Sequence, residues 1–495
     1  MKILSAEQIR NADNFTIENE PISSVDLMER ASSAFVSQFL RLHPEKKPVY
    51  IFCGTGNNGG DGLAISRLLK NNGWTIFPFV IGEITEGSDD FTTNLKRLKK
   101  YRSITDLSVF PKIDSHSIII DGLFGTGLTR PIEGLYAKLI EYLNAQKAQK
   151  ISIDIPSGLY VDKPILQEDA VFEADCTISF QMPKLTFFLP DYRRYTGKWS
   201  TINIGLHEDF IAKQPTNLFC TTKNEMINLV PQRMWFTHKN QVGRLMIVAG
   251  SVGKIGAAIL CARAAFRAGV GLVNVHTPHC GIDALQIAIP EAMVSVDEGE
   301  THIESIPKVN DVVAIGPGIA TELNTVSSFR GFIKTHDEPL VIDADGINIL
   351  SENKDLLEHL PKQSILTPHP GEFKKLVGEW QNDFDKLTKL RNFCVENEVN
   401  VVLKGAYSAV CNTEGNIFFN PTGNPGLATA GSGDVLTGIV GALLAQGLTP
   451  FEALRLGVYL HGASGDEAVS GLKTSWIQAS DIISFIGFAV NSLVN

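Results

Sequence analysis

Residues 430–438 (AGSGDVLTG) place glycines, a hydroxyl and one carboxylate directly before an apolar stretch typical of a helix. Helix starts present free backbone N–H groups and the positive end of the peptide dipole, which together can hold a transferring phosphate. In that position Asp434 could take a proton from a substrate hydroxyl as a general base. The alternative is a tight loop in which Asp434 only caps the helix.

A second glycine-rich segment, residues 54–62 (GTGNNGGDG), follows an apolar strand pattern and precedes a helical one. It contains Gly-x-Gly-x-x-Gly, the fingerprint of dinucleotide binding. The expected acid at the end of the next strand has only Glu83 as a late candidate, and Asn57, Asn58 and Asp61 make the loop unusually polar. Such oxygens suit a hydroxylated ligand or a hard cation better than a plain pyrophosphate turn. We predict a functional loop, with a structural turn as the alternative.

Two more loops follow predicted strands in this half, at residues 121–131 (DGLFGTGLTRP) and 154–158 (DIPSG). Ligands of open α/β sheets bind at the carboxyl ends of the strands. Asp121 and Asp154 could each simply cap a loop. Together with Asn58, however, they would supply carboxylate, amide and hydroxyl oxygens around one point. The pattern predicts a small-molecule site with a monovalent cation.

Five loops of the second half also follow predicted strands, at residues 249–258, 316–318, 343–346, 366–372 and 404–408. His369 stands between two prolines, which predicts contact with a ligand. Lys404 could neutralise nucleotide phosphates or face solvent. Asp343 and Asp345 could reach magnesium through water or cap the next helix, and capping is the favoured interpretation.

Apolar strand patterns alternate with amphipathic helix patterns in two series, which predicts parallel sheets covered by helices. The first series has strands at 49–53, 75–81, 117–121, 151–154, 176–179 and 201–204. Its helices are expected at 25–42, 60–71, 91–100 and 132–143. The second series has strands at 245–249, 272–276, 311–315, 340–342, 364–367 and 401–403. Its helices are expected at 433–445, 451–469 and 479–493. Residues 205–222 lack periodicity and are interpreted as the domain junction.

The composition limits the possible partners and the compartment. A chain of 495 residues suggests two or three domains. The formal charge of −10 argues against binding nucleic acid or anionic membranes. Seven scattered cysteines fit a reducing compartment, and the sequence shows no signal peptide or membrane span, so a cytoplasmic protein is expected. Exposed apolar helices favour a homo-oligomer.

As a set and in this order, these motifs resemble the family of bifunctional NAD(P)H-hydrate repair enzymes over nearly the whole chain. The resemblance implies two three-layer α/β/α domains. Residues 1–210 would form a Rossmann-like NAD(P)H-hydrate epimerase, and residues 220–495 a ribokinase-like dehydratase. The first would interconvert the R and S forms of the NADH hydrate, NADHX, and of the NADPH hydrate, NADPHX. The second would dehydrate the S form at the expense of ADP or ATP.

The resemblance also implies site residues, with Asp434 as catalytic base and Asp154 as a proton-transfer group. Potassium would lie at Asn58, Asp121 and Ser157. Hydrate contacts in the first half are expected from Asn57, Asn58, Gly59, Gly60, Asp61, Gly125, Thr126, Gly127, Leu128, Thr129, Arg130, Pro131 and Asp154. Hydrate contacts in the second half are expected from Ala257, Gly318, His369 and Asp434. The nucleotide, with Mg²⁺ bridging its phosphates, would lie at Lys404, Gly405, Ala406, Tyr407, Ser408 and Gly433. Gly346 departs from the family pattern, which has alanine there.

Two other functions stay open from the sequence. A ribokinase-like small-molecule kinase, fused to a Rossmann-like binding module, would use the same Gly-Ser-Gly-Asp chemistry and release a phosphorylated alcohol. Alternatively, the first half could be a scaffolding module, as in eukaryotic proteins of RNA-decay assemblies. The presence of Asn58, Asp121 and Asp154 speaks against the loss of a site there.

Overall fold

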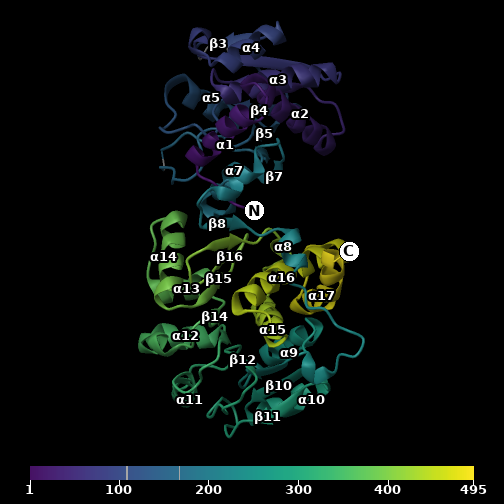
Figure 1. The fold of residues 1–495 in the computed structure, drawn as a ribbon, viewed down its shortest axis with the longest axis vertical. Helices are drawn as coiled ribbons and strands as arrows, with labels where there is room; N and C mark the ends of the chain where they lie inside the picture. Colours follow the sequence, from purple (N-terminus) through teal and green to yellow (C-terminus); the bar gives the residue numbers. More distant parts are fainter. Residues whose placement is uncertain (107–109, 167, 495) are drawn as a thin grey trace. The chain divides into compact units, whose positions relative to one another are not determined.

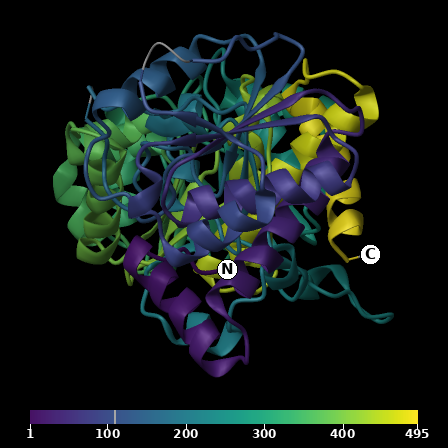
Figure 2. The same cartoon turned by 90° about the horizontal axis from the view of Figure 1, so that it is seen from above.

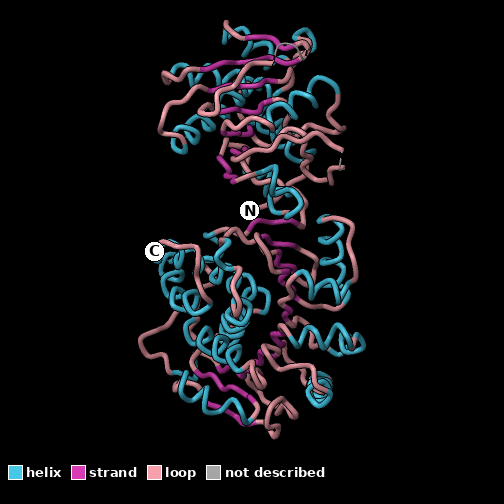
Figure 3. The backbone as a smooth tube through the Cα atoms, turned by 180° about the vertical axis from the view of Figure 1, so that it is seen from behind, coloured by secondary structure: helices cyan, strands magenta, loops and turns pink. Residues whose placement is uncertain are grey.

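The computed structural model describes residues 1–106, 110–166 and 168–494. The chain divides into two compact units, Met1–Leu218 and Phe219–Asn495. In each unit a sheet lies between layers of helices (Figure 1), which confirms the predicted α/β/α class. Figure 3 shows the strands of each sheet side by side, with helices flanking them. Among the described residues, no helix has both the length and the hydropathy needed to cross a bilayer.

The sheet of the first unit has seven strands in the order β3-β2-β1-β4-β5-β6-β7, and all neighbouring pairs are parallel. The strands are β1 (Val49–Cys53), β2 (Ile76–Ile81), β3 (Arg102–Ile104), β4 (Ile118–Gly122), β5 (Gln149–Ile153), β6 (Cys176–Phe180) and β7 (Lys198–Ile202). The strand order reverses between β1 and β4, and a ligand crevice forms at such a point. The loops after β1, β4 and β5 therefore meet at one edge. The strand expected at 201–204 starts earlier, at Lys198.

Helices cover both faces of this sheet. They are α1 (Ala6–Asn19), α2 (Ser24–Leu42), α3 (Asn57–Asn71), α4 (Asp89–Leu98), α5 (Gly134–Asn144), α6 (Arg193–Thr196) and α7 (Glu208–Lys213), with 3-10 turns η1 (Ile84–Glu86), η3 (Leu185–Phe188) and η4 (Pro190–Tyr192). Successive strand residues point to opposite faces, so Ile51 packs with α2, α3 and α4 while Phe52 packs with α5. Burial on both faces explains the nearly continuous apolar strands.

The second unit contains a ten-stranded sheet in the order β11-β10-β9-β12-β13-β14-β15-β16-β17-β8. The strands are β8 (Leu218–Cys220), β9 (Arg244–Val248), β10 (Leu272–Thr277), β11 (Met293–Val296), β12 (Val312–Ile315), β13 (Leu340–Ile342), β14 (Ile365–Leu366), β15 (Asn400–Leu403), β16 (Ala409–Cys411) and β17 (Ile417–Phe419). From β11 to β15 neighbouring strands are parallel, whereas β16 is antiparallel to β15 and β17.

Two groups of helices cover this second sheet. The helices are α8 (Lys223–Ile227), α9 (Ile255–Arg267), α10 (Ile282–Ala288), α11 (Leu323–Ile333), α12 (Asp345–Glu352), α13 (Pro370–Val377), α14 (Asp383–Glu396), α15 (Ser432–Ala445), α16 (Pro450–Leu472) and α17 (Ala479–Val494), with 3-10 turns η5 (Lys239–Gln241), η6 (His279–Gly281), η7 (Lys354–His359) and η8 (Pro425–Leu427). Helices α13 and α14 (green) lie on the opposite side from the yellow helices α16 and α17 (Figures 1 and 2).

Helix α15 is the central helix of the second unit. It is apolar on every side, as expected for a helix surrounded by protein, and it packs against α9, α16 and strands β9 and β12. A Cβ on Gly438 would come within 2.1 Å of the Cys261 carbonyl oxygen, so only glycine permits this approach to α9. This close packing fixes the position of the first turn of α15, where the Gly-Ser-Gly-Asp motif lies.

Candidate functional site

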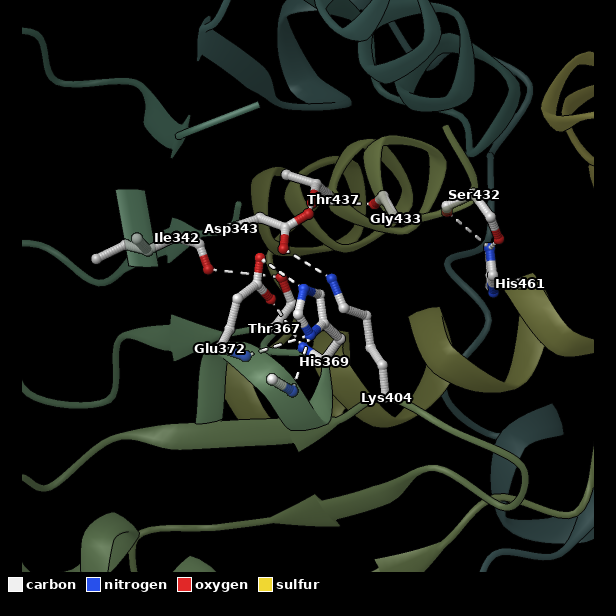
Figure 4. Close-up of polar contacts among 11 residues, drawn as sticks. Ile342, Asp343, Thr367, His369, Glu372, Lys404, Ser432, Gly433, Thr437 and His461 are labelled. Atoms are coloured by element: carbon white, nitrogen blue, oxygen red, sulfur yellow. Dashed lines mark hydrogen bonds and ion pairs between the residues drawn. The ribbon is translucent and has the colours of Figure 1, made fainter. Parts of the chain in front are cut away.

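The first turn of α15 carries Ser432, Gly433 and Asp434, directly after Gly431. Gly431 is the N-cap and has φ of 84°, in the left-handed region that favours glycine. The interpretation of Asp434 as the N-cap is therefore wrong. The hydroxyl and carbonyl of Ser432 lie 3.1 and 3.0 Å from Nε2 of His461, and burial lowers the pKa of that histidine to about 4. A neutral His461 thus anchors this turn on α16 (Figure 4).

The Asp434 carboxyl group is half-buried and is not a strong acid. Burial and then the nearby charge of Asp343 raise its pKa, Lys404 lowers it, and the pKa comes to about 6. A carboxylate with a pKa near the working pH can accept a proton in one step of a reaction and release it in the next. The geometry therefore fits a general base beside the backbone donors of a helix start.

Asp343 joins three elements behind this turn. It is fully buried and accepts hydrogen bonds from Lys404 Nζ at 2.9 Å and Thr437 Oγ1 at 2.7 Å (Figure 4). Lys404 Nζ lies 3.3 Å from the point where a Cβ on Gly433 would stand, so its charge is next to the first turn of α15. Burial lowers the pKa of Lys404, but Asp343 and Glu372 together raise it above its ordinary value.

The predicted cap of α12 is wrong, because its N-cap is Ala344 and no side chain caps it. Asp343 instead binds Lys404 and Thr437. Asp345 accepts the backbone N–H of Ala320 at 2.9 Å and pairs with Lys254 at 3.1 Å. Of the described residues, no group of three or more His, Cys, Asp or Glu side chains is placed to hold a metal ion.

His369 is the N-cap of α13, a role that the sequence analysis missed. Its Nδ1 accepts the backbone N–H groups of Gly371 at 3.0 Å and Glu372 at 3.2 Å, and the Glu372 carboxylate accepts the N–H of His369 at 2.8 Å. Its Nε2 lies 3.5 Å from Glu372 Oε1, and the imidazole is 56% exposed, so a ligand can still reach the ring. Burial raises the pKa of Glu372, and Lys404 opposes that shift.

The other predicted residues of this half lie at three strand ends. Ala257 is in the first turn of α9, and a Cβ on Gly318 would stand 3.3 Å from its Cβ, so these two predicted hydrate contacts adjoin. Residues 404–408 form the turn between β15 and β16. Within it, Ser408 Oγ accepts the Gly405 N–H at 3.3 Å and donates to the Gly405 carbonyl at 3.0 Å. Gly405 faces open space, so a ligand can approach its backbone.

In the first unit, Asn57, Asn58, Gly59, Gly60 and Asp61 form the first turn of α3 rather than a loop. The helix begins three residues earlier than expected, because Gly59 and Gly60 permit close packing. A Cβ on the former would come within 1.8 Å of the Gly54 carbonyl oxygen, and one on the latter within 2.8 Å of Met28 Sδ. The backbone N–H groups of this turn point toward the edge of the sheet where ligands bind.

The three residues predicted to hold potassium come together after β4. Asp121 is fully buried and accepts the Ser157 hydroxyl at 2.6 Å and the Ser157 N–H at 2.8 Å. The Asn58 amide donates to the Phe124 carbonyl at 3.0 Å, and Gly125 lies against Asn58. Carboxylate, hydroxyl, amide and carbonyl oxygens are the ligands that a hard cation prefers, so this donor set fits potassium.

Asp154 belongs to a separate network with Lys184. It has φ of 64°, accepts the Phe180 N–H at 2.9 Å and forms an ion pair with Lys184. Lys184 is almost fully buried, and its ammonium group also donates to Ser179 Oγ at 2.9 Å. The sequence predicted that Asn58, Asp121 and Asp154 supply oxygens around one point. In the structure, Asp154 instead belongs to a different hydrogen-bond network from Asn58 and Asp121.

Two more carboxyl groups face Asp154. Burial, followed by the charge of Asp154, raises the pKa of Asp13 to about 7, and Lys184 opposes that rise. Burial and Asp154 also raise the pKa of Asp61, and Asp13 adds to the effect. Neither Asp13 nor Lys184 was predicted as a site residue from the sequence. The signals were present, because Lys184 closely follows the strand at 176–179, and Ser5 and Gln8 form the capping box that starts α1.

Known proteins match both units. A profile of the family described as NAD(P)H-hydrate dehydratase matches residues 245–486, and one described as YjeF-related protein N-terminus matches residues 24–186. The chain is 33% identical over 517 residues to the bifunctional NAD(P)H-hydrate repair enzyme of Moorella thermoacetica, covering 100% of this chain and 97% of that relative. It is 31% identical over 498 residues to the enzyme of the same description from Escherichia coli, covering 98% and 93%.

Among solved structures, the chain is similar to the ADP/ATP-dependent NAD(P)H-hydrate dehydratase from Bacillus subtilis co-crystallised with ATP and Mg²⁺. The TM-score is 0.49 at 25% identity, and the alignment covers 56% of this chain and 100% of that one.

Proposed function

The chain belongs to the family of bifunctional NAD(P)H-hydrate repair enzymes, and from this membership we propose which residues carry each activity. It is an NAD(P)H-hydrate epimerase and an ADP/ATP-dependent NAD(P)H-hydrate dehydratase. The epimerase interconverts the R and S hydrates, and the dehydratase returns the S form to the reduced cofactor. We assign the epimerase to residues 1–210 and the dehydratase to residues 220–495, supported by the two family matches within those ranges.

In the dehydratase, Asp434 removes the proton from the hydroxyl group of the S hydrate. The deprotonated oxygen attacks the terminal phosphoryl group of ADP or ATP, which turns a poor leaving group into a phosphate ester. Phosphate then leaves, the neighbouring ring carbon loses a proton to solvent, and the ring double bond is restored. The observation that carries this assignment is the raised pKa of a carboxyl group in the first turn of α15, at a helix start that presents backbone N–H groups.

The backbone N–H groups of residues 431–433 and the ammonium group of Lys404 stabilise the transferring phosphoryl group, because both lie beside Asp434. The nucleotide lies along residues 404–408, where Gly405 leaves its backbone accessible. Magnesium, bound to the nucleotide phosphates, would supply positive charge during transfer. Ala257, Gly318 and His369 form the hydrate subsite.

In the epimerase, the first turn of α3 and residues 125–131 contact the hydrate, and Asp154 transfers a proton. Asn58, Asp121 and Ser157 would hold potassium, which would supply a fixed positive charge beside the substrate. The oxygen donors found together after β4 support this assignment. We also propose a cytoplasmic homo-oligomer, supported by the exposed apolar side chains of the second unit, among them Trp235 at 99% and Phe236 at 98% exposure.

The test is Asp434→Asn in the full chain, with a mixed R and S hydrate, magnesium and ADP or ATP. We expect restoration of the reduced-nicotinamide absorbance and release of phosphate to slow about a hundredfold to ten-thousandfold. R-to-S interconversion, followed by chromatography, should persist. Asp283→Asn is the matched control, because Asp283 is an exposed acid in the first turn of α10.

Two results would overturn the assignment. Dehydration at the parent rate in the Asp434→Asn variant would exclude the base. A stable phosphorylated alcohol as product of the parent chain, without restored absorbance, would favour the rival small-molecule kinase.

A further inference from the structure

Helix α1 brings two charged side chains to the epimerase site. Arg10 and Asp13 are three residues apart and therefore share one face of the helix. Arg10 Nη2 lies 3.9 Å from the point where a Cβ on Gly127 would stand, within the loop that contacts the hydrate. Asp13 interacts electrostatically with Asp154 and Lys184. One face of α1 thus meets both the glycine loop and the acidic network.

The helix is held firmly in this position. A capping box of Ser5 and Gln8 starts it, and the backbone N–H of Ala6 donates to the Asp162 carboxylate at 3.0 Å. Ala12 is fully buried in a cluster with Leu27 and other apolar residues. Asp13, next in the chain, is therefore placed by packing rather than by a flexible loop. The family match to this unit begins at residue 24, after α1.

We propose that Asp13 is a catalytic residue of the epimerase, which donates a proton to the ring hydroxyl group of the hydrate. The inference rests on the epimerase activity and not on the assignment of Asp434. Its basis is the position of Asp13 on the face of α1 whose Arg10 lies against Gly127, together with its electrostatic interaction with Asp154, which is ion-paired with the buried Lys184. Asp154 is ion-paired with Lys184, and Asp61 is buried and accepts the Ser32 hydroxyl at 3.3 Å. Asp13 is only partly buried, so it is the carboxyl group of the three that a hydrate can reach.

The step needs no redox partner. The hydroxyl group sits on the ring carbon next to nitrogen, because the nitrogen lone pair stabilises a cation there. Asp13 transfers its proton to the hydroxyl oxygen, the carbon–oxygen bond breaks, and the nitrogen lone pair forms a carbon–nitrogen double bond as water leaves. Water then adds to the opposite face of the same carbon and gives its proton to the Asp154 carboxylate. Asp154 releases that proton to solvent and Asp13 takes one up, which restores both carboxyl groups. The net change is inversion at one carbon.

Asp13→Asn tests the proposal in the full chain. Proton donors contribute about a hundredfold to ten-thousandfold, so R-to-S interconversion should slow by that factor. Dehydration of purified S hydrate should stay at the parent rate, and an unchanged unfolding temperature of the first unit should show that this unit is folded in the variant. Glu18→Gln, the same change of charge at an exposed position of α1, should alter neither rate.

The pH profile separates catalysis from a purely structural role. An acid must be protonated, so epimerisation by the parent should fall as pH rises above about 7, the pKa of Asp13. The groups that face Asp13 are Asp61 on α3, Asp154 after β5, Lys184 before η3 and Arg10 on its own helix. Asp13→Glu should keep a falling limb, and Asp13→Asn should lose it. Interconversion by Asp13→Asn within threefold of the parent, or an unchanged limb, would overturn the proposal.

Discussion

Asp434 lies where two electrostatic effects oppose each other. The first turn of a helix favours a charged carboxylate, since the dipole presents its positive end there. The charge of Lys404 acts in the same direction as the dipole. Burial and the charge of Asp343 outweigh both, and the pKa of Asp434 rises to about 6. With a much lower pKa, Asp434 would be a poor base. With a much higher pKa, it would already be protonated at neutral pH. The placement of Asp343 therefore matters for the reaction although it need not touch the substrate.

The pH dependence of dehydration should show this pKa. The base must be ionised, so kcat/KM for the S hydrate should fall tenfold per pH unit below about pH 6 and level off above it. The measurement is initial rate against pH with saturating nucleotide, and epimerisation of the same preparation serves as the control for inactivation. A dehydration rate that is independent of pH between about 5 and 8 would contradict the role of Asp434.

Helix α15 must pack closely against α9 and must also present the backbone N–H groups of its first turn to the site. Gly438 lets it approach α9, and Gly431 makes the left-handed turn that exposes the backbone donors. At the other end, Gly447 ends the helix with φ of 96° and has open space around its α-carbon. The two end glycines share a backbone conformation but differ in their surroundings, which makes them a matched pair.

Gly431→Ala should lower both stability and dehydration. The left-handed conformation costs alanine about 1–2 kcal/mol, and the new Cβ would lie 2.4 Å from Leu260 Cδ1, which displaces the donor turn. Gly447→Ala should show a similar loss in urea unfolding with a normal dehydration rate. Equal rates in the two variants would show that the donor turn is not part of the site.

Helices and strands could be predicted from the sequence where their apolar residues were strongly periodic. Where the pattern was weak, as at α3, the element was found but its start was not. Strands such as β1 and helices such as α2 were predicted within one residue, because burial on both faces leaves a plain pattern. The start of α3 was missed, since glycine and asparagine are poor helix formers and only packing against Gly54 and Met28 explains it.

The candidate site residues were predicted where loops followed strands, because all such loops share one sheet edge. Asp13 was missed because it lies on a helix more than a hundred residues from its partners in sequence, Asp154 and Lys184. Asp343 was expected as a helix cap, yet its partners Lys404 and Thr437 come from the turn after β15 and from α15. Contacts between distant segments leave no local signal in a single sequence.

Each unit has its own buried core. In the first, separate apolar clusters lie on the two faces of the sheet, and in the second, α9, α15, α16 and α17 enclose a cluster with their sheet. Nucleotide binding should therefore stabilise the dehydratase unit alone, by about 2.7 kcal/mol at one hundred times the dissociation constant.

Scanning calorimetry with and without ADP and magnesium checks this expectation. One unfolding transition should move to higher temperature while the other stays. The Asp121→Asn variant removes a buried carboxylate acceptor only from the first unit, so it should lower the unfolding temperature of that unit. The transition that this variant shifts should be the one that ADP leaves in place. A rise of both transitions by the same amount would show that the units unfold as one.

The division at residue 218 also bears on how such genes can change. The apolar clusters of the two units share no residue, so a stop codon and a new start codon just before β8 would interrupt one reading frame without removing a residue from any of them. Gene fission and fusion at this point would then leave these clusters complete. Selection is free to keep the halves as one transcript for equal dosage or to express them separately.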